Sequence, residues 1–165
     1  MRFCIGNRVH LAAFITGLYD YDNTTRKFAD VLSGKKTRVT LGYPEIAAAK
    51  SFGVSPRTKI VLKRSYALHM DNSGHFTGLG YGKNGHRDPY PLTIRQVSLI
   101  PEIIKTARQT EIFSDERVRG LQRYRIERKE SWGQIIIVEV SINRNEIYLV
   151  TAYNKNNTPT IGCIY

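Results

Sequence analysis

The sequence has few of the residues that build a disulfide framework or a zinc site of the common kind. Its 165 residues include two cysteines, Cys4 and Cys163, one near each end of the chain. No C-x-x-C pair occurs, so we do not expect a cysteine-based structural zinc site. Chain termini often lie close together, which leaves a single disulfide between the two cysteines open.

The sequence also lacks an apolar run that is long enough to cross a membrane as a helix. A spanning helix needs about 20 predominantly apolar residues, whereas the apolar stretch from Val9 to Tyr19 is shorter and contains His10. Arginines precede this stretch, as in a signal peptide, but no clear small-x-small cleavage site follows before Asp20. We therefore expect a cytoplasmic-type chain without a signal peptide.

Acidic residues are scarce relative to basic ones. Lys and Arg total 25 against 14 Asp and Glu, so the formal net charge at pH 7 is +11. A field of this sign favours a polyanionic partner, with nucleic acid first and an acidic protein or an anionic membrane second. The alternative is a basic surface that is only solvated. The length and the 41% of hydrophobic residues predict one globular domain with a sizeable core.

Two β-type runs near the C-terminus predict a hairpin at the centre of an antiparallel sheet. Gln134–Ser141 is rich in β-branched residues, which pack well on a pleated surface. The polar residues of Ser141–Asn145 predict the turn, because asparagine tolerates a positive φ. Glu146–Tyr153 then alternates. We expect one face to carry Ile147, Leu149 and Thr151, and the other to carry Tyr148, Val150 and Ala152.

Helix-type segments precede most of the strand-type segments, which is typical of an α+β fold. We expect N-terminal helices packed on a C-terminal antiparallel β-sheet. Residues 1–55 would form a helical and extended segment packed on a core of residues 56–165, in one globular unit. The expected helices cover residues 23–32, 45–52 and 66–70, and a segment from Gln96 or Pro101 to Gln109; the expected strands outside the hairpin cover residues 39–41, 59–62, 118–129 and 160–165.

His69 and His75 are the first candidates for acid–base chemistry. They follow an apolar strand segment and enter the Gly- and Asn-rich stretch from Asp71 to Arg87, whose length and aromatic content favour a functional loop. Imidazole titrates near neutrality, so two histidines can divide the roles of base and acid. His86 is a weaker third candidate, and a metal site that includes Asp71 lacks a third and fourth ligand. The alternative is a solvent-facing or structural histidine pair.

Basic side chains gather on both sides of these histidines and on the strand before the hairpin. Lys59, Lys63 and Arg64 flank the histidine segment. Because strand side chains repeat every second residue, Arg119, Arg123 and Arg125 should share one face, with Arg128 out of phase. Guanidinium groups bind phosphates in a bidentate manner and stabilise charge that develops during phosphoryl chemistry. A solvated sheet face is the alternative.

Thr151 and Tyr153 lie at the end of the last hairpin strand, where VTAY gives way to a polar tail. Both are odd-numbered positions and should share a face. A hydroxyl there can position a scissile phosphate, and the tyrosine ring can stack on a base. The alternative is a cross-strand threonine beside a packing tyrosine.

The order of these segments resembles a nuclease family. The chain has KIVLKRSYALHMDNSGH, then LIPEIIKTARQ, a basic strand, an apolar strand and IYLVTAYNKNN. This arrangement is similar to the phage- and toxin-associated branch of the barnase–EndoU–colicin–RelE-like (BECR) nucleases. The similarity extends over residues 59–157, and the "H…H" and "VTAY" elements are its most telling parts.

The resemblance implies a metal-independent endoribonuclease without a cofactor, of the toxin or phage-associated type. His69, His75, Thr151 and Tyr153 would match the family's catalytic positions, and Arg125 is chosen as a catalytic phosphate-binding residue by its strand placement. Lys63, Arg64 and Arg123 would bind the substrate.

In the implied reaction the ribose 2′-oxygen attacks phosphorus and leaves a 2′,3′-cyclic phosphate. His69 is the base, and His75 or a tyrosine is the acid. The implied partners are RNA, with tRNA as one candidate, and an acidic immunity or antitoxin protein, and the chain would act in its own or a target cell's cytoplasm. The alternatives are a non-catalytic nucleic-acid-binding domain, a phage structural accessory domain of the same fold, or a protein–protein adaptor.

Overall fold

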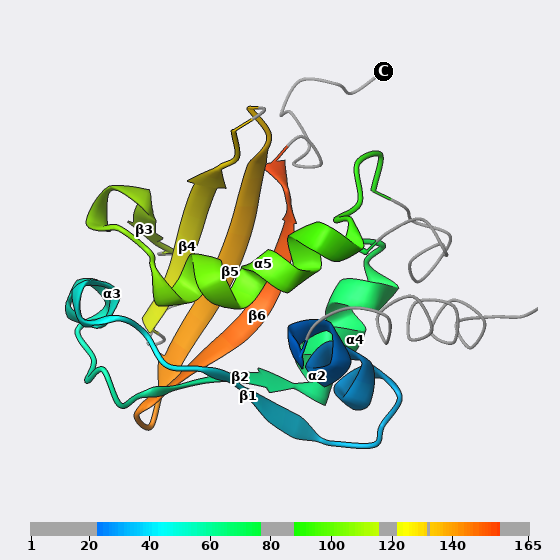
Figure 1. Ribbon diagram of the computed structural model, residues 1–165, viewed down its shortest axis with the longest axis horizontal. Coiled ribbons are helices and arrows are strands. Elements are labelled where there is room, and N and C mark those ends of the chain that lie inside the picture. Colours follow the sequence, from blue (N-terminus) through cyan, green and yellow to red (C-terminus); the bar gives the residue numbers. More distant parts are fainter. Residues whose placement is uncertain (1–22, 77–87, 116–121, 132, 156–165) are drawn as a thin grey trace, which may run out of the picture.

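The computed structural model describes residues 23–76, 88–115, 122–131 and 133–155. Over these residues it contains four α-helices and a six-stranded sheet with the strand order β1-β2-β6-β5-β4-β3 (Figure 1). The elements are α2 (Asn23–Leu32), β1 (Arg38–Gly42), α3 (Ile46–Phe52), β2 (Lys59–Lys63), α4 (Arg64–Asn72), α5 (Ile94–Lys105), the 3-10 helix η2 (Gln109–Glu111), β3 (Ile112–Ser114), β4 (Gln122–Lys129), β5 (Ile135–Asn143) and β6 (Glu146–Asn154).

The α+β class is confirmed, but the expected separation into N-terminal helices and a C-terminal antiparallel sheet is wrong. Helices and strands alternate from α2 to α4, and β1 and β2 belong to the same sheet as the C-terminal hairpin. β2 pairs in parallel with the start of β6, and the other strand pairs are antiparallel. The sequence of β2 explains its place, because three consecutive residues, Ile60, Val61 and Leu62, are fully buried and need a central position.

Local sequence signals account for most of the elements. The helix expected at residues 23–32 has those bounds, and the expected strand at 59–62 extends by one residue. α5 begins at Ile94, earlier than expected, because Thr93 and Gln96 form a capping box. β3 was not predicted, since a three-residue edge strand has no periodic pattern to recognise. The expected strand at 160–165 lies outside the described residues.

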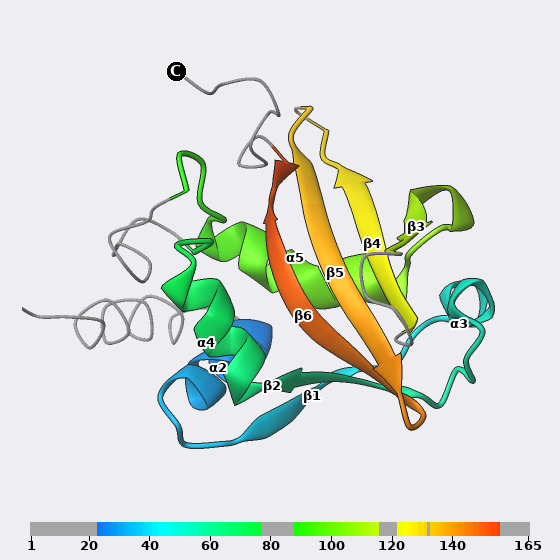
Figure 2. The same ribbon diagram turned by 180° about the vertical axis from the view of Figure 1, so that it is seen from behind.

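One face of the sheet carries the hydrophobic core. Ile126, Val138 and Ala152 are register partners across β4, β5 and β6, and all three are fully buried. α5 crosses this face (Figure 1), and its Ile100 and Ile104 join the same cluster. No described helix crosses the opposite face of β4, β5 and β6 (Figure 2), and α4 contacts the edge of β6. No helix in the described part of the chain is long and apolar enough to span a membrane.

A β-bulge in β6 places Thr151 on the opposite face of the sheet from the one predicted. Glu139 pairs with Thr151, whereas the next residue of β5, Val140, pairs with Leu149. β6 therefore has one extra residue, Val150, and the alternation of its side chains changes phase there. Leu149 stays on the core face while Thr151 moves to the opposite, polar face. Simple alternation across the whole strand could not reveal this shift.

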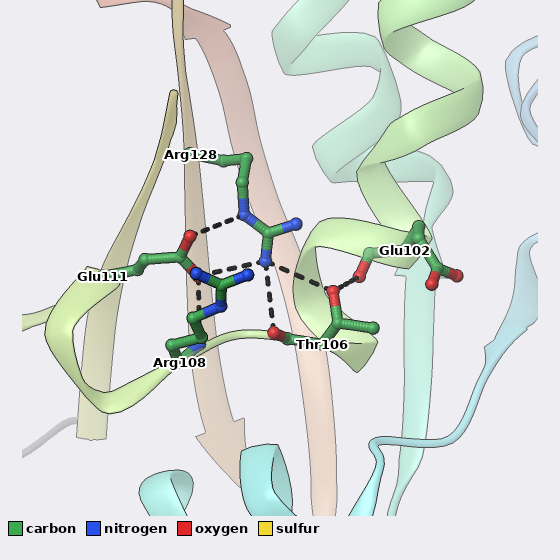
Figure 3. Close-up of polar contacts among 5 residues, drawn as sticks. All are labelled: Glu102, Thr106, Arg108, Glu111 and Arg128. Carbon is green, nitrogen blue, oxygen red and sulfur yellow. Dashed lines mark hydrogen bonds and ion pairs between the residues drawn. The ribbon is translucent and has the colours of Figure 1, made fainter. Parts of the chain in front are cut away.

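Hydrogen bonds among Arg128, Glu111 and Thr106, together called the polar clasp, hold the edge strand β3 in place (Figure 3). Arg128 lies on the core side of β4, as its out-of-phase position predicted, and donates through Nε and Nη2 to the two carboxylate oxygens of Glu111 at 2.7 and 3.0 Å. The same Nη2 donates to the backbone oxygen and the hydroxyl of Thr106 at 3.2 Å. Burial opposes ionisation of Glu111, but the hydrogen bonds from Arg128 and from the Arg108 backbone outweigh it and lower the pKa of this carboxyl. The clasp thus ties η2, which leads into β3, to the end of α5.

Ile136 and Ile46 offer a matched pair for testing the assignment of the core. Ile136 is fully buried on β5, whereas Ile46, at the start of α3, is 78% exposed. Ile136→Ala should lower the free energy of unfolding by about 2–5 kcal/mol, because it removes buried methyl groups and leaves a cavity. Ile46→Ala should change it by less than about 0.5 kcal/mol. Urea unfolding measures both, and equal effects of the two substitutions would contradict the assigned core.

Candidate active site

A row of polar side chains crosses the face of the sheet opposite the core. Arg125 on β4 pairs with Glu139 on β5, and Glu139 pairs with Thr151 on β6. Register partners point to the same side of a sheet, so these three residues share the polar face. Arg123 precedes Arg125 by two residues and shares this face, as the sequence predicted. The three longest strands thus place a cation, a carboxylate and a hydroxyl side by side.

Glu139 is the centre of this arrangement. Its side chain is 5% exposed, although a lone buried carboxylate is costly. Arg123 donates from Nη2 to one carboxylate oxygen at 2.9 Å, and the Tyr153 hydroxyl donates to the other at 3.2 Å. Asp115 lies 3.7 Å from Nε of Arg123 on the other side of the guanidinium. Glu139 therefore holds Arg123 and Tyr153 in fixed positions.

His75 extends the arrangement from the sheet toward α4. Its ring lies 5.5 Å from the ring of Tyr153, centroid to centroid, with an interplanar angle of 32°. Nδ1 of His75 lies 2.6 Å from a carboxylate oxygen of the buried Asp88. A carboxylate at this distance favours the tautomer with hydrogen on Nδ1 and fixes the ring orientation, which leaves Nε2 as the nitrogen that is not engaged by Asp88.

His69 forms the exposed end of the same group. It lies in the last turns of α4, and its ring centroid is 6.3 Å from that of His75. Burial lowers the pKa of His69 below 6.5, and the charges of His75 and Arg123 lower it further, while Glu139 acts in the opposite direction. His69 is therefore predominantly neutral at pH 7, the form that accepts a proton. His69, His75, Arg123, Glu139 and Tyr153 are called the acid–base cluster below.

The other residues predicted for the site lie around this cluster. Thr151 is adjacent to Glu139, and its buried hydroxyl has no hydrogen-bond partner among the residues that the structure describes. Arg125 lies on the same face, but its Nη2 pairs with Glu127 at 3.1 Å. Lys63 places its ammonium 4.1 Å from the ring centroid of Tyr148. Thr151 and Arg125 border the cluster without joining its hydrogen bonds, whereas the contact of Lys63 is with Tyr148, nearer the start of β6.

Arg64 is not brought to the cluster. It begins α4, about one and a half turns before His69, and its guanidinium lies next to Gly34 in the turn that follows α2. His86, Arg119, Cys4 and Cys163 lie outside the described residues. Four predicted positions (His69, His75, Arg123 and Tyr153) thus come together directly, and Thr151 and Arg125 lie beside them.

Sequence reasoning did not identify Glu139 and Asp88. Glu139 is the only charged residue in the run IIIVEVSI, and an isolated carboxylate in such a run is a signal that could have revealed it. Asp88 has no comparable signal, because it lies in a polar segment 13 residues after His75 and only the fold brings the two together.

Two cavities lined by described residues lie away from the acid–base cluster. One of about 770 Å³ lies between α3, the end of α5 and Arg128, and another of about 690 Å³ lies beside the β5–β6 turn at Arg144. No member of the cluster lines either of them. Over the described residues, no group of three or more His, Cys, Asp and Glu side chains is arranged to hold a metal ion.

The electrostatics of the cluster predict how His69 titrates. Its imidazole should titrate below pH 6.5 in an NMR experiment. Arg123→Ala should move this pKa upward because it removes a positive charge, and Glu139→Gln should move it further downward because it removes a negative one. Arg144→Ala, at the far end of the hairpin, should leave it unchanged.

The same shift couples His69 to folding. The unfolded chain binds a proton more readily than the folded chain, so stability should decrease as the pH falls through 6.5 toward the folded-state pKa. His69→Gln should remove this part of the pH dependence. A His69 pKa at or above 6.5 would contradict the arrangement of charges described for the cluster.

Comparison with known proteins does not assign the chain to a family. No family model, no curated protein and no solved structure matches it. The resemblance to BECR nucleases therefore stays a prediction based on motifs, and the function has to be inferred from the geometry of the acid–base cluster.

Proposed function

We propose that this chain is a metal-independent endoribonuclease with a BECR-like fold, which cleaves RNA by attack of the ribose 2′-hydroxyl and leaves a 2′,3′-cyclic phosphate. The observation that carries the proposal is the acid–base cluster itself. Two imidazoles from the α4 region meet a guanidinium, a carboxylate and a phenol from three strands. This set supplies the proton transfer and the charge neutralisation that phosphodiester cleavage requires.

The two histidines take different roles because their surroundings differ. His69 has a lowered pKa and is neutral near pH 7, so it is the base that removes the 2′-hydroxyl proton. His75 is held by Asp88 through Nδ1, so it is the acid that protonates the leaving 5′-oxygen through Nε2. A separation of 6.3 Å between the ring centroids allows both imidazoles to approach oxygens of one phosphodiester.

The cationic side chains supply the electrostatic part of the reaction. Arg123 directs one guanidinium nitrogen at Glu139 and is partly exposed, so its remaining N–H groups are the nearest donors for a phosphate. Arg125, two residues further along β4, adds a second cation to the same face, and Lys63 adds a third at the ring of Tyr148. Thr151 lies beside Glu139 on the same face, but its hydroxyl is buried and is not a direct phosphate ligand in this conformation.

The overall charge fits this proposal and indicates the kind of partner. With +11 at pH 7, the chain attracts RNA, tRNA among the candidates, through its phosphates. A toxic nuclease of this charge would be neutralised by an acidic immunity or antitoxin protein, since complementary charge accelerates and orients association. The motif resemblance is the basis for a toxin or phage-associated role in the cytoplasm. The net positive charge supports RNA and an acidic protein as the partners in that role.

A non-catalytic nucleic-acid-binding domain, or a phage accessory domain of the same fold, is the second candidate. The observation that favours it is the internal pairing of the cluster. Glu139 is neutralised by Arg123, and Asp88 contacts His75, as expected of a polar network that only stabilises the sheet. Such a domain would bind RNA with a steep dependence on salt and would not turn it over.

Cleavage of total RNA and of tRNA in EDTA tests the proposal. His69→Ala should lower the rate by about 10²- to 10⁴-fold, because it removes a general base. Arg123→Ala should lower it by about 10²- to 10³-fold, because it removes charge stabilisation. End-group analysis should find 2′,3′-cyclic phosphates.

Arg144→Ala is the matched control for the loss of one positive charge, since Arg144 lies in the β5–β6 turn at the other end of the hairpin. It should retain the wild-type rate, and urea unfolding should show that each variant is folded. Full activity of a folded His69→Ala protein would reject the assigned base. Salt-dependent binding without cleavage by the wild type would favour the second candidate.

A further inference from the structure

Phe113 is an exposed aromatic residue at the end of the row that contains Glu139. It lies on the edge strand β3 and is 44% exposed. Phe113 pairs with Arg125, Arg125 pairs with Glu139, and Glu139 pairs with Thr151. Register partners share a face, so the exposed ring and the acid–base cluster lie on the same side of the sheet.

Neighbouring residues hold this ring in place. The guanidinium carbon of Arg125 lies 5.6 Å from the ring centroid, and Arg125 is held in turn by its ion pair with Glu127. Behind the strand, the clasp between Arg128 and Glu111 anchors the turn that leads into β3 (Figure 3). An aromatic face next to a guanidinium, on a strand fixed from behind, is suited to stack on a planar ligand.

We propose that Phe113, with Arg125 beside it, is a stacking subsite for an unpaired base of the RNA, a short distance along the strand from the scissile linkage. This inference rests on the proposed ribonuclease function and specifies its substrate. Neighbouring strands are about 4.8 Å apart, so β3 lies about 14 Å from β6, where Tyr153 meets His75. The stacked base therefore belongs to a nucleotide beyond the two that the scissile bond joins. A base in a duplex has no free face to offer, so the substrate is a single-stranded segment or loop.

Binding of a single-stranded RNA dodecamer tests the subsite. A 2′-deoxyribose at the cleavage position prevents turnover, so fluorescence anisotropy reports affinity alone. Phe113→Ala should weaken binding between about fivefold and about a hundredfold. Phe113→Trp should restore it. Tyr43→Ala is the matched control, because Tyr43 is another exposed aromatic, 49% accessible, and follows β1 at the opposite edge of the sheet.

Abasic substitutions in the dodecamer locate the base that stacks. At one position near the cleavage site, loss of the base should weaken binding to the wild type as much as Phe113→Ala does. The Phe113→Ala protein should lose nothing further at that position, because the two changes remove the same contact. The same dodecamer in a duplex should bind the wild type and the Phe113→Ala protein equally.

Three outcomes separate the subsite from the nuclease proposal. If the wild type cleaves RNA and Phe113→Ala binds as tightly as Tyr43→Ala, the subsite is rejected and the nuclease proposal stands. If the wild type binds without cleaving and Phe113→Ala loses affinity, the subsite stands and the nuclease proposal fails. If RNA affinity is unchanged and Phe113→Ala instead loses a protein partner, the exposed ring belongs to a protein interface and the subsite is rejected.

Discussion

The carboxylate of Glu139, buried in the middle of a sheet, is the constraint on which the rest of the polar face depends. An ionised group in that position costs several kcal/mol unless it is paired and hydrogen-bonded. Arg123 on β4 and Tyr153 on β6 meet that requirement from both sides. Each of the two neighbouring strands therefore has to keep one particular register against β5. The arrangement of side chains from which we propose catalysis is thus the same arrangement that makes the buried charge tolerable.

The two sides of the sheet differ in polarity. One side is covered by α5 and contains the apolar cluster, while the other presents polar groups. The histidines reach the polar side because β2 pairs only with Glu146, Ile147 and Tyr148 of β6. Beyond Tyr148 the edge of β6 is free for α4, which continues directly from β2. Because β2 is short and α4 follows it directly, His69 in α4 and His75 just after it lie beside a sheet whose described strands contain no histidine.

Much of the fold was predictable from the sequence because its signals are local. The β-branched run of β5, the alanine-rich α3 and the turn at Arg144 and Asn145 follow from propensity and turn chemistry. The site was predictable only in part. His69, His75, Arg123 and Tyr153 stand out as residue types, whereas the contact between His75 and Asp88 depends on tertiary structure. The parallel pairing of β2 with β6 and the single-residue bulge also have no local signature.

The extra residue at Val150 gives β6 two different periodicities within one strand. Below it, the even-numbered Tyr148 shares the polar face with Ser141, and above it the odd-numbered Thr151 and Tyr153 do so. Substitutions along this strand would each disturb one contact. If Val150 instead took a regular paired position, the hydroxyls of Thr151 and Tyr153 would point toward the hydrocarbon interior and Ala152 would face the polar side. The bulge at Val150 is therefore as strict a requirement for the polar face as the identity of any side chain on β6.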